Sequence, residues 1–245
     1  MCVRWVWLAS VAALVAAALA GEWLYESGRL RFNYPSHTRF PVRGIDVSHH
    51  QGLVDWETVA RSGIHFAFIK ATEGADHSDL RFEENWQAAG RAGLARGAYH
   101  YFTFCTPGAR QAEHFIATLA PFTPELPPGV NVEFSGNCRA WKSIAAIRRE
   151  LAIFLSRVEE AQGVRPVLYL TRKSGREIAH GHFPRHRLWV RDILFEPDAT
   201  RWGAWRFWQY ADNARLPGIH GPVDLNVFCC GLQQLRSATA LHSTP

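Results

Sequence analysis

Short apolar runs alternate with amphipathic stretches along most of the chain, and this alternation constrains the fold more than any other feature. Eight apolar runs predict strands, at residues 44–48, 65–71, 97–104, 127–134, 165–171, 187–193, 205–211 and 223–228. Helical spacing predicts helices between the first five strands, at residues 56–63, 80–94, 107–120 and 143–163. Strands that alternate with helices form parallel sheets, and eight of them predict closure into a barrel.

The later connections are too short for this pattern to continue. Residues 194–204 and 212–222 separate the last three strands, whereas a parallel crossover needs about a dozen residues or more. We therefore predict an α/β fold, an irregular TIM-like β/α barrel of eight strands and about five helices, whose later strands lack full helices. The barrel is expected over residues 43–235, after a linker or lead-in at 21–42 and before a tail at 236–245.

The N-terminus has the pattern of an export signal. Arg4 precedes an apolar stretch from residue 5 to residue 20, and the triplet Ala-Leu-Ala before Gly21 resembles a small-x-small cleavage site. Residues 1–20 predict a secretory signal peptide, with an uncleaved membrane anchor at residues 5–20 as the alternative. In both cases the protein is expected outside the cytoplasm, either periplasmic, extracellular or anchored to the membrane, where disulfides form.

Two other function classes receive little support from the charged residues. The chain has a net charge of +5, but its Lys and Arg residues are scattered, so no nucleic-acid partner is expected. His180, His182 and His186 lie in a predicted loop without a carboxylate at ligand spacing, so neither a metal site nor a cofactor is expected. His49 and His50 either rim a cleft or lie at the surface. We expect a monomer.

Polar residues cluster near the strand ends. In "VNVEF", Asn131 and Glu133 alternate with apolar residues and therefore share the face that points to the barrel axis. Glu133, as the second-last residue of its predicted strand, is expected at the C-terminal mouth, the usual place of active sites in such barrels, rather than on a surface loop. Other strand ends supply Asp46, Glu73, Tyr99, Tyr101, Tyr169, Trp208, Gln209 and Asp224. Carboxylates and aromatic residues without a phosphate loop or metal cluster are typical of glycoside hydrolysis.

Eight blocks of the sequence resemble, in order, those of the glycoside hydrolase family 25 lysozymes. They are "GIDVSHHQG", "FAFIKATEG", "GAYHYF", "VNVEF", "RPVLYLT", "LWV", "WRFWQYAD" and "GIHGPVDLNVF", which span about residues 43–232. The resemblance implies an N-acetylmuramidase on an irregular β/α barrel, which cuts the β-1,4 bond after N-acetylmuramic acid. It also implies peptidoglycan glycan strands as the binding partner.

The resemblance also implies roles for individual residues. Glu133 resembles the general acid, while Asp46 and Asp224 resemble acidic residues of the first and last strands. Substrate-binding residues are expected at Glu73, Tyr99, Tyr169, Trp208 and Gln209. Cys105 and Cys138 would follow neighbouring strands, close enough to form a disulfide, whereas the adjacent Cys229 and Cys230 are not expected to bond to each other without strain.

Asn131 departs from the Asp-x-Glu motif that is usual in the family. An asparagine can orient an amide by hydrogen bonding, but it cannot supply negative charge. The sequence therefore predicts a lysozyme whose activity is reduced by the asparagine at this position. The alternative is a peptidoglycan-binding protein that kept the cleft but no longer cleaves the glycan. A chitinase-like enzyme on another barrel fits less well, because "PPGVNVE" lacks a run of alternating acids.

Overall fold

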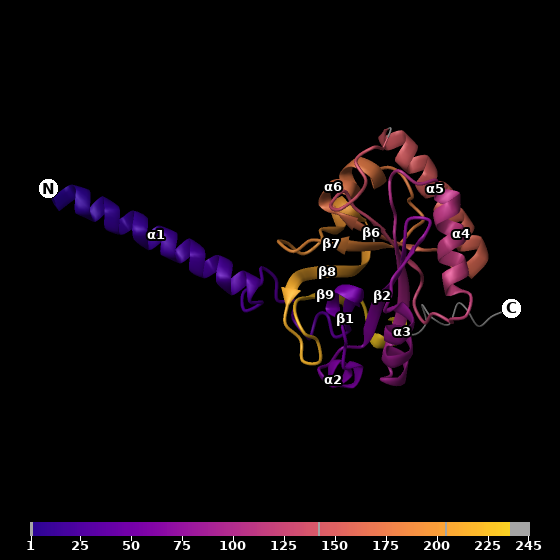
Figure 1. Ribbon diagram of the computed structural model, residues 1–245, viewed down its shortest axis with the longest axis horizontal. Helices are drawn as coiled ribbons and strands as arrows, with labels where there is room; N and C mark the ends of the chain where they lie inside the picture. Colours follow the sequence, from indigo (N-terminus) through magenta and orange to yellow (C-terminus); the bar gives the residue numbers. More distant parts are fainter. Residues whose placement is uncertain (1, 142, 204, 236–245) are drawn as a thin grey trace.

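Eight strands close into a barrel, as the apolar runs predict. The computed structural model describes residues 2–141, 143–203 and 205–235 (Figure 1). The barrel strands are β1 (Arg43–Val47), β2 (Phe66–Glu73), β4 (Ala95–Tyr101), β5 (Gly129–Val132), β6 (Val167–Thr171), β7 (Leu188–Arg191), β8 (Trp205–Ala214) and β9 (Val223–Phe228). Pairing of β1 with both β2 and β9 closes the barrel, and β3 (His77–Ser78) forms a short extra strand on β2.

The last strand corrects the expectation of an all-parallel sheet. From β1 to β8 neighbouring barrel strands run parallel, but β9 runs antiparallel to both β8 and β1. Only residues 215–222 connect β8 to β9, and a connection that short suits antiparallel neighbours. The direction of β9 brings its N-terminal end, rather than its C-terminal end, to the mouth.

Four full helices cover one side of the barrel (Figure 1). They are α2 (Trp56–Arg61), α3 (Phe82–Arg91), α4 (Gly108–Leu119) and α5 (Ile144–Gln162). Ser143 caps the start of α5 by accepting a hydrogen bond from the backbone of Ala146, and Gly163 ends it with a φ of 66°. Among the described residues between β6 and β8, the helical segments are short, namely α6 (Arg172–Ser174), the π-helix η2 (Gly175–Ala179) and α7 (Ala199–Trp202). The prediction that the later strands lack full helices is confirmed.

Aromatic rings fill the lower part of the barrel interior. Phe68 on β2 stacks on Trp189 of β7, with ring centroids 4.3 Å apart. The neighbouring strand β4 has Gly97 beside this ring, where a methyl group would lie 2.5 Å from the ring of Phe68. Because side chains fill this space, the lower interior is a packed core, and a ligand can enter the barrel interior only at the mouth.

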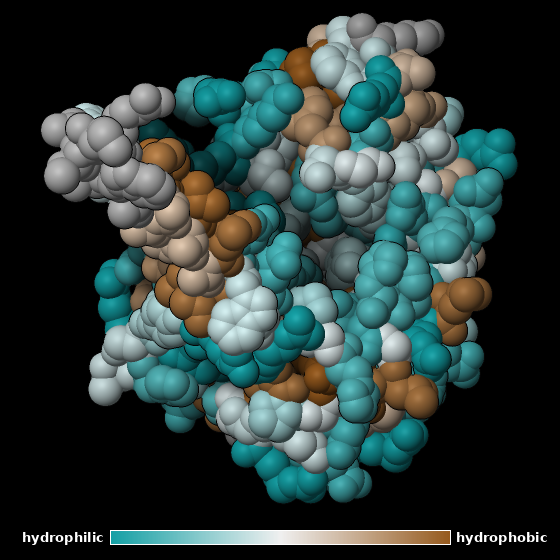
Figure 2. Space-filling model, turned by 60° about the vertical axis from the view of Figure 1, so that its left-hand side comes forward, coloured by the Kyte–Doolittle hydropathy of each residue, from teal (hydrophilic) through white to brown (hydrophobic). Residues whose placement is uncertain are grey.

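The segment before the barrel packs against it. Asn213 of β8 donates to the backbone oxygens of Tyr25 and Leu30 at 2.6 and 3.0 Å, and Phe40 is buried at 4% exposure. Apart from its last residues, α1 (Cys2–Glu26) extends away from the barrel (Figure 1). Its apolar side chains form a brown band in Figure 2. In the part of the chain that the structure describes, no helix has the length and apolar character needed to cross a membrane.

Candidate active site

The floor of the mouth is a hydrogen-bonded network centred on Asp46. Gln209 donates to Asp46 at 2.9 Å and to Asp224 at 3.0 Å, and Asn226 donates to Asp46 at 2.6 Å. Tyr169 fixes the orientation of Gln209 by donating to its side-chain oxygen at 2.9 Å. Four strands, β1, β6, β8 and β9, therefore hold one carboxylate in place through side chains that all face inward.

Asp46 and Asp224 form a carboxyl pair whose charges act on each other. They are direct partners across the antiparallel β1–β9 ladder, where Asp46 is buried and Asp224 is partly exposed. Burial raises the pKa of Asp46, which the hydrogen bonds from Gln209 and Asn226 oppose. Burial, and then the negative charge of Asp46, raises the pKa of Asp224 well above its usual value. Of the two carboxyls, Asp224 therefore keeps its proton to the higher pH, and the negative charge of the pair lies on Asp46.

Asn131 and Glu133 touch each other at the mouth. The amide nitrogen of Asn131 donates to Glu133 Oε1 at 2.9 Å, whereas Asn131 Oδ1 is buried without a partner among the described residues. Glu133 is the first residue after β5, not the second-last residue of the strand as predicted, because β5 ends at Val132. The contact between the two side chains shows that they lie on the same face, as the alternation predicts.

Burial dominates the electrostatics of Glu133. It raises the pKa of the carboxyl, as does the charge of Asp46, while the amide of Asn131 and the charges of Arg191 and Lys70 lower it. Lys70 is itself paired with Glu73 at 2.7 Å. The net direction is upward, so Glu133 retains a proton at higher pH than an exposed glutamate does.

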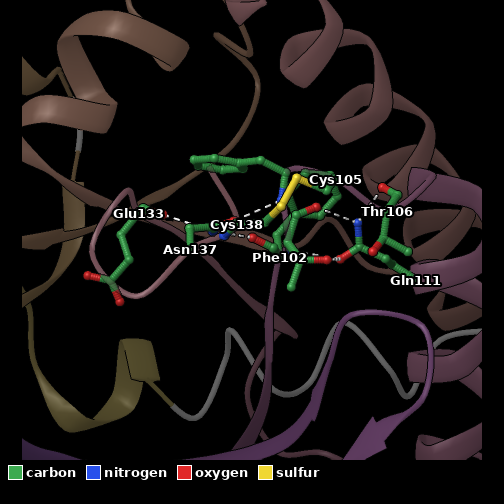
Figure 3. The surroundings of a disulfide bond; sticks show 9 residues. Phe102, Cys105, Thr106, Gln111, Glu133, Asn137 and Cys138 are labelled. Atoms are coloured by element: carbon green, nitrogen blue, oxygen red, sulfur yellow. Dashed lines mark hydrogen bonds between the residues drawn. A yellow bond between two sulfur atoms is a disulfide. The ribbon is translucent and has the colours of Figure 1, made fainter. Parts of the chain in front are cut away.

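The backbone that carries Glu133 is tied to the loop after β4. Asn137 donates to the backbone oxygens of Glu133 and Phe102, both at 2.9 Å (Figure 3). Beside it, Cys105 and Cys138 form the predicted disulfide, and the side chain of Glu133 points away from it in Figure 3. These connections hold the start of the Glu133 loop against the neighbouring loop.

The second cysteine pair differs from expectation. The structure pairs the adjacent Cys229 and Cys230, an arrangement that the sequence did not favour. The pair follows the end of β9, and Arg206 lies 3.5 Å from both sulfur atoms.

Two tyrosines face the acidic floor, as expected for the cleft. Tyr169 is buried and Tyr99 partly buried beside it, and removal from water together with the nearby carboxylates raises the pKa of each phenol well above its usual value. Tyr101 lies higher in the mouth, where Lys70 sits over its ring at 5.3 Å and its hydroxyl donates to Ser135 O at 2.5 Å.

Trp208 does not line the cleft, contrary to the prediction. It is 2% exposed, packs against Phe40 outside the barrel and donates to the backbone oxygen of Asp192. Alternation along β8 explains this, because Gln209 points inward and its neighbour must therefore point outward.

Sequence reasoning missed several residues of the site. They are Lys70, Asn137, Trp189, Arg191 and Asn226. Trp189 orients Asn226 through a hydrogen bond of 2.7 Å, and Arg191 pairs with Asp212 at 2.5 Å. The alternation of side chains along a strand could have predicted that Lys70 points inward, because it shares a face with Phe66 and Phe68.

The histidines occupy two separate places. His49 pairs with Asp79 at 2.8 Å and stacks near His50, whose pKa is lowered by burial and by the adjacent charges of His49 and Lys70. His180, His182 and His186 line a different cavity. Within the described residues, no three His, Cys, Asp or Glu side chains form a group that could hold a metal ion.

Comparison with known proteins identifies similar sequences and structures. The family model described as "Glycosyl hydrolases family 25" matches residues 45–219. "Uncharacterized protein YegX" of Escherichia coli K12 is 36% identical, over 84% of this chain and 76% of that protein. "Lysozyme M1" of Streptomyces globisporus is 33% identical, over 76% of this chain and 67% of that protein. A solved family 25 glycosyl hydrolase from Bacillus anthracis is 30% identical, with a TM-score of 0.79, covering 86% of this chain and 98% of that one.

Proposed function

The chain belongs to glycosyl hydrolases family 25 and is a peptidoglycan hydrolase of the muramidase type, and we propose that Glu133 is its general acid. The proposed reaction is cleavage of the β-1,4 bond between N-acetylmuramic acid and N-acetylglucosamine. The observation that carries the assignment is the partly buried Glu133 carboxyl at the mouth, whose pKa is raised by removal from water. A carboxyl that keeps its proton near neutral pH can transfer it to the glycosidic oxygen as the bond breaks.

Asp46 supplies the negative charge that faces the sugar ring. As the bond to the leaving group breaks, positive charge develops on the ring. Gln209 and Asn226 hold Asp46 at 2.9 and 2.6 Å, so its charge is fixed before the reaction starts. Asp224 keeps its own proton and therefore adds no second negative charge beside Asp46.

Asn131 orients the N-acetyl group of the substrate and limits the rate. Its Oδ1 is buried without a partner, so it can accept a hydrogen bond from the substrate's amide N–H, while its amide nitrogen holds Glu133. A neutral amide cannot stabilise positive charge as a carboxylate does. We therefore expect weaker cleavage than an aspartate at position 131 would give.

A second candidate function is peptidoglycan binding without cleavage. Asn131 is the observation that favours it, because the amide preserves hydrogen bonding in the cleft and removes a charge from it. The tyrosines and the acidic floor would bind glycan equally well in both cases.

The proposed place of action is the cell wall, outside the cytoplasm, with the barrel acting as a monomer. The signal-like N-terminus and the disulfide between Cys105 and Cys138 support an oxidising compartment. The exposed apolar side chains of α1, among them Leu14 and Leu19, support a cleaved signal or an anchor at residues 5–20.

Digestion of purified peptidoglycan tests the cleavage. We expect muropeptides with new reducing ends at N-acetylmuramic acid. Glu133→Gln is the matched control, because glutamine keeps the shape but has no proton to transfer. Its rate should fall by about 10²–10⁴-fold while glycan binding persists. Glycan that is bound but uncut by the parent chain would establish the second candidate, and a fully active Glu133→Gln variant would place the acid elsewhere.

A further inference from the structure

A cavity of about 960 Å³ lies on the outer wall of the barrel, away from the mouth. Its floor includes Leu168 and Leu170 of β6 and Leu188 of β7. On these strands Tyr169 and Trp189 face the interior, so the leucines face outward and the barrel wall separates the cavity from the active site. The cavity exists because short turns, rather than a full helix, connect β6 to β7.

The rim of this cavity is strongly cationic. It contains six arginines and three histidines but no acidic residue: Arg165, Arg172, Arg176, Arg185, Arg187, Arg201, His180, His182 and His186. Ion pairs with Glu159, Asp192 and Glu177 neutralise three of the arginines. Across the described residues, the other three, Arg185, Arg187 and Arg201, have no ion pair, which leaves an excess of positive charge.

The floor and back of the cavity are apolar. Besides the leucines, they include Phe183 and Trp202. The ring of Trp202 packs on Gly175, where an added methyl group would lie 2.5 Å from that ring. A cavity of this size and polarity matches the range of small-molecule sites.

The backbone around the cavity is unusual in two places. Phe183 has a φ of 56°, and it is the one non-glycine residue with positive φ among the described residues. The π-helix η2 forms another part of the wall. Strained residues and π-turns persist where the surrounding structure fixes them, and they are common at functional sites.

We propose that this cavity binds a phosphate-monoester amphiphile with a single apolar chain, of the lysophosphatidic acid type. The phosphate would contact Arg185, Arg187 and Arg201, and the apolar chain would cover the leucines and Trp202. Three unpaired cations match the near-double charge of a phosphate monoester better than a single carboxylate. The apolar floor favours a lipid over a free phosphate ion. This site is independent of the peptidoglycan cleft.

Calorimetric titration of the full chain with three probes tests the ligand class. The probes are dodecyl phosphate below its micelle concentration, inorganic phosphate and the neutral dodecyl maltoside. We expect one dodecyl phosphate per chain, bound at least about tenfold more tightly than either other probe. Equal affinity for inorganic phosphate would make this a free-anion site, and equal affinity for the maltoside an apolar one. Either result, or no binding at all, overturns the proposal.

Paired variants test the location. Arg187→Ser with Arg201→Ser should weaken dodecyl phosphate binding at least about tenfold. The matched control, Arg91→Ser with Arg110→Ser, removes the same charge from exposed arginines of α3 and α4 outside the cavity and should leave binding unchanged. Both double variants should have the same circular dichroism spectrum and the same rate of glycan cleavage as the parent chain. Equal loss in the two pairs would mean that only net charge attracts the probe, which contradicts a site in this cavity.

Discussion

At the scale of single residues, the contact between Asn131 and Glu133 sets the pH at which the acid can act. The amide donates to the Glu133 carboxylate, which favours the ionised form and lowers the pKa, while burial raises it further than the amide lowers it. An aspartate at position 131 would remove the donor and add a like charge. Both changes raise the pKa of Glu133.

Asn131→Asp should therefore raise the cleavage rate and extend activity to higher pH. A general acid works only while protonated, so activity falls as pH rises through the pKa of Glu133. Raising that pKa should move the alkaline limb of kcat/KM upward by about one unit. The measurement is a pH–rate profile of both forms on soluble glycan.

Asn131→Ala separates the two effects, because it removes the donor without adding charge. Its alkaline limb should move upward by less, and its rate should fall. An Asp variant that is no faster than the parent, with its alkaline limb unmoved, would mean that Asn131 is not the electrostatic partner of Glu133.

The carboxyl pair on the floor should make the stability of the fold depend on pH. In the native state Asp224 keeps a proton that the unfolded chain releases near pH 4. The native state then binds more protons than the unfolded state, so the free energy of unfolding falls as pH rises from about 4 through the folded pKa.

Asp224→Asn should remove this loss, because asparagine mimics the protonated form. The variant should be more stable than the parent at pH 7, with the difference shrinking towards pH 4, and it should cleave more slowly. Urea unfolding across this pH range measures the difference. A variant less stable than the parent at pH 7 would show that native Asp224 is ionised.

At the scale of elements, apolar runs predicted all eight barrel strands, because each strand is buried on both sides. It was harder to predict where each strand ends and which of its side chains point into the barrel. β5 is four residues long and ends before Glu133. On β8, either Trp208 or Gln209 could point into the barrel, and only the structure shows that Gln209 does. The direction of β9 has no signature in its own residues. Asp224 reaches the mouth because β9 runs opposite to its neighbours.

The disulfide between Cys105 and Cys138 joins the two loops at the edge of the active site. Replacing both cysteines with serine should lower the free energy of unfolding by about 2–4 kcal/mol. It should also lower kcat, because Asn137 and the disulfide fix the loop that starts at Glu133. Urea unfolding and cleavage assays measure both effects.

Asn137→Ala is the comparison for the disulfide, because it removes the hydrogen bonds of this loop and leaves the disulfide intact. Mass spectrometry of an unreduced digest checks the bond directly. Free thiols at both positions in the native protein would contradict the assignment.

At the scale of the whole molecule, the lead-in segment is connected to the active site. Tyr25, at the end of α1, donates to Asp212 at 2.7 Å, and burial together with Asp212 raises the pKa of Tyr25 to about 12. Asp212 in turn pairs with Arg191, whose charge acts on Glu133. The end of α1 and the segment after it therefore support the mouth of the barrel as well as its outer wall.

Removing this segment should destabilise the barrel, whereas removing residues 1–20 should not. A chain of residues 42–245 loses buried Phe40 and the contacts of Tyr25, whereas a chain of residues 21–245 keeps them. Loss of a buried phenylalanine costs about 3–5 kcal/mol, so the shorter chain should unfold at clearly lower urea, and Phe40→Ala in the longer chain should show most of the same loss. Urea midpoints of the three proteins decide the matter. Equal midpoints for the two truncated chains would mean that the segment lies on the barrel without stabilising it.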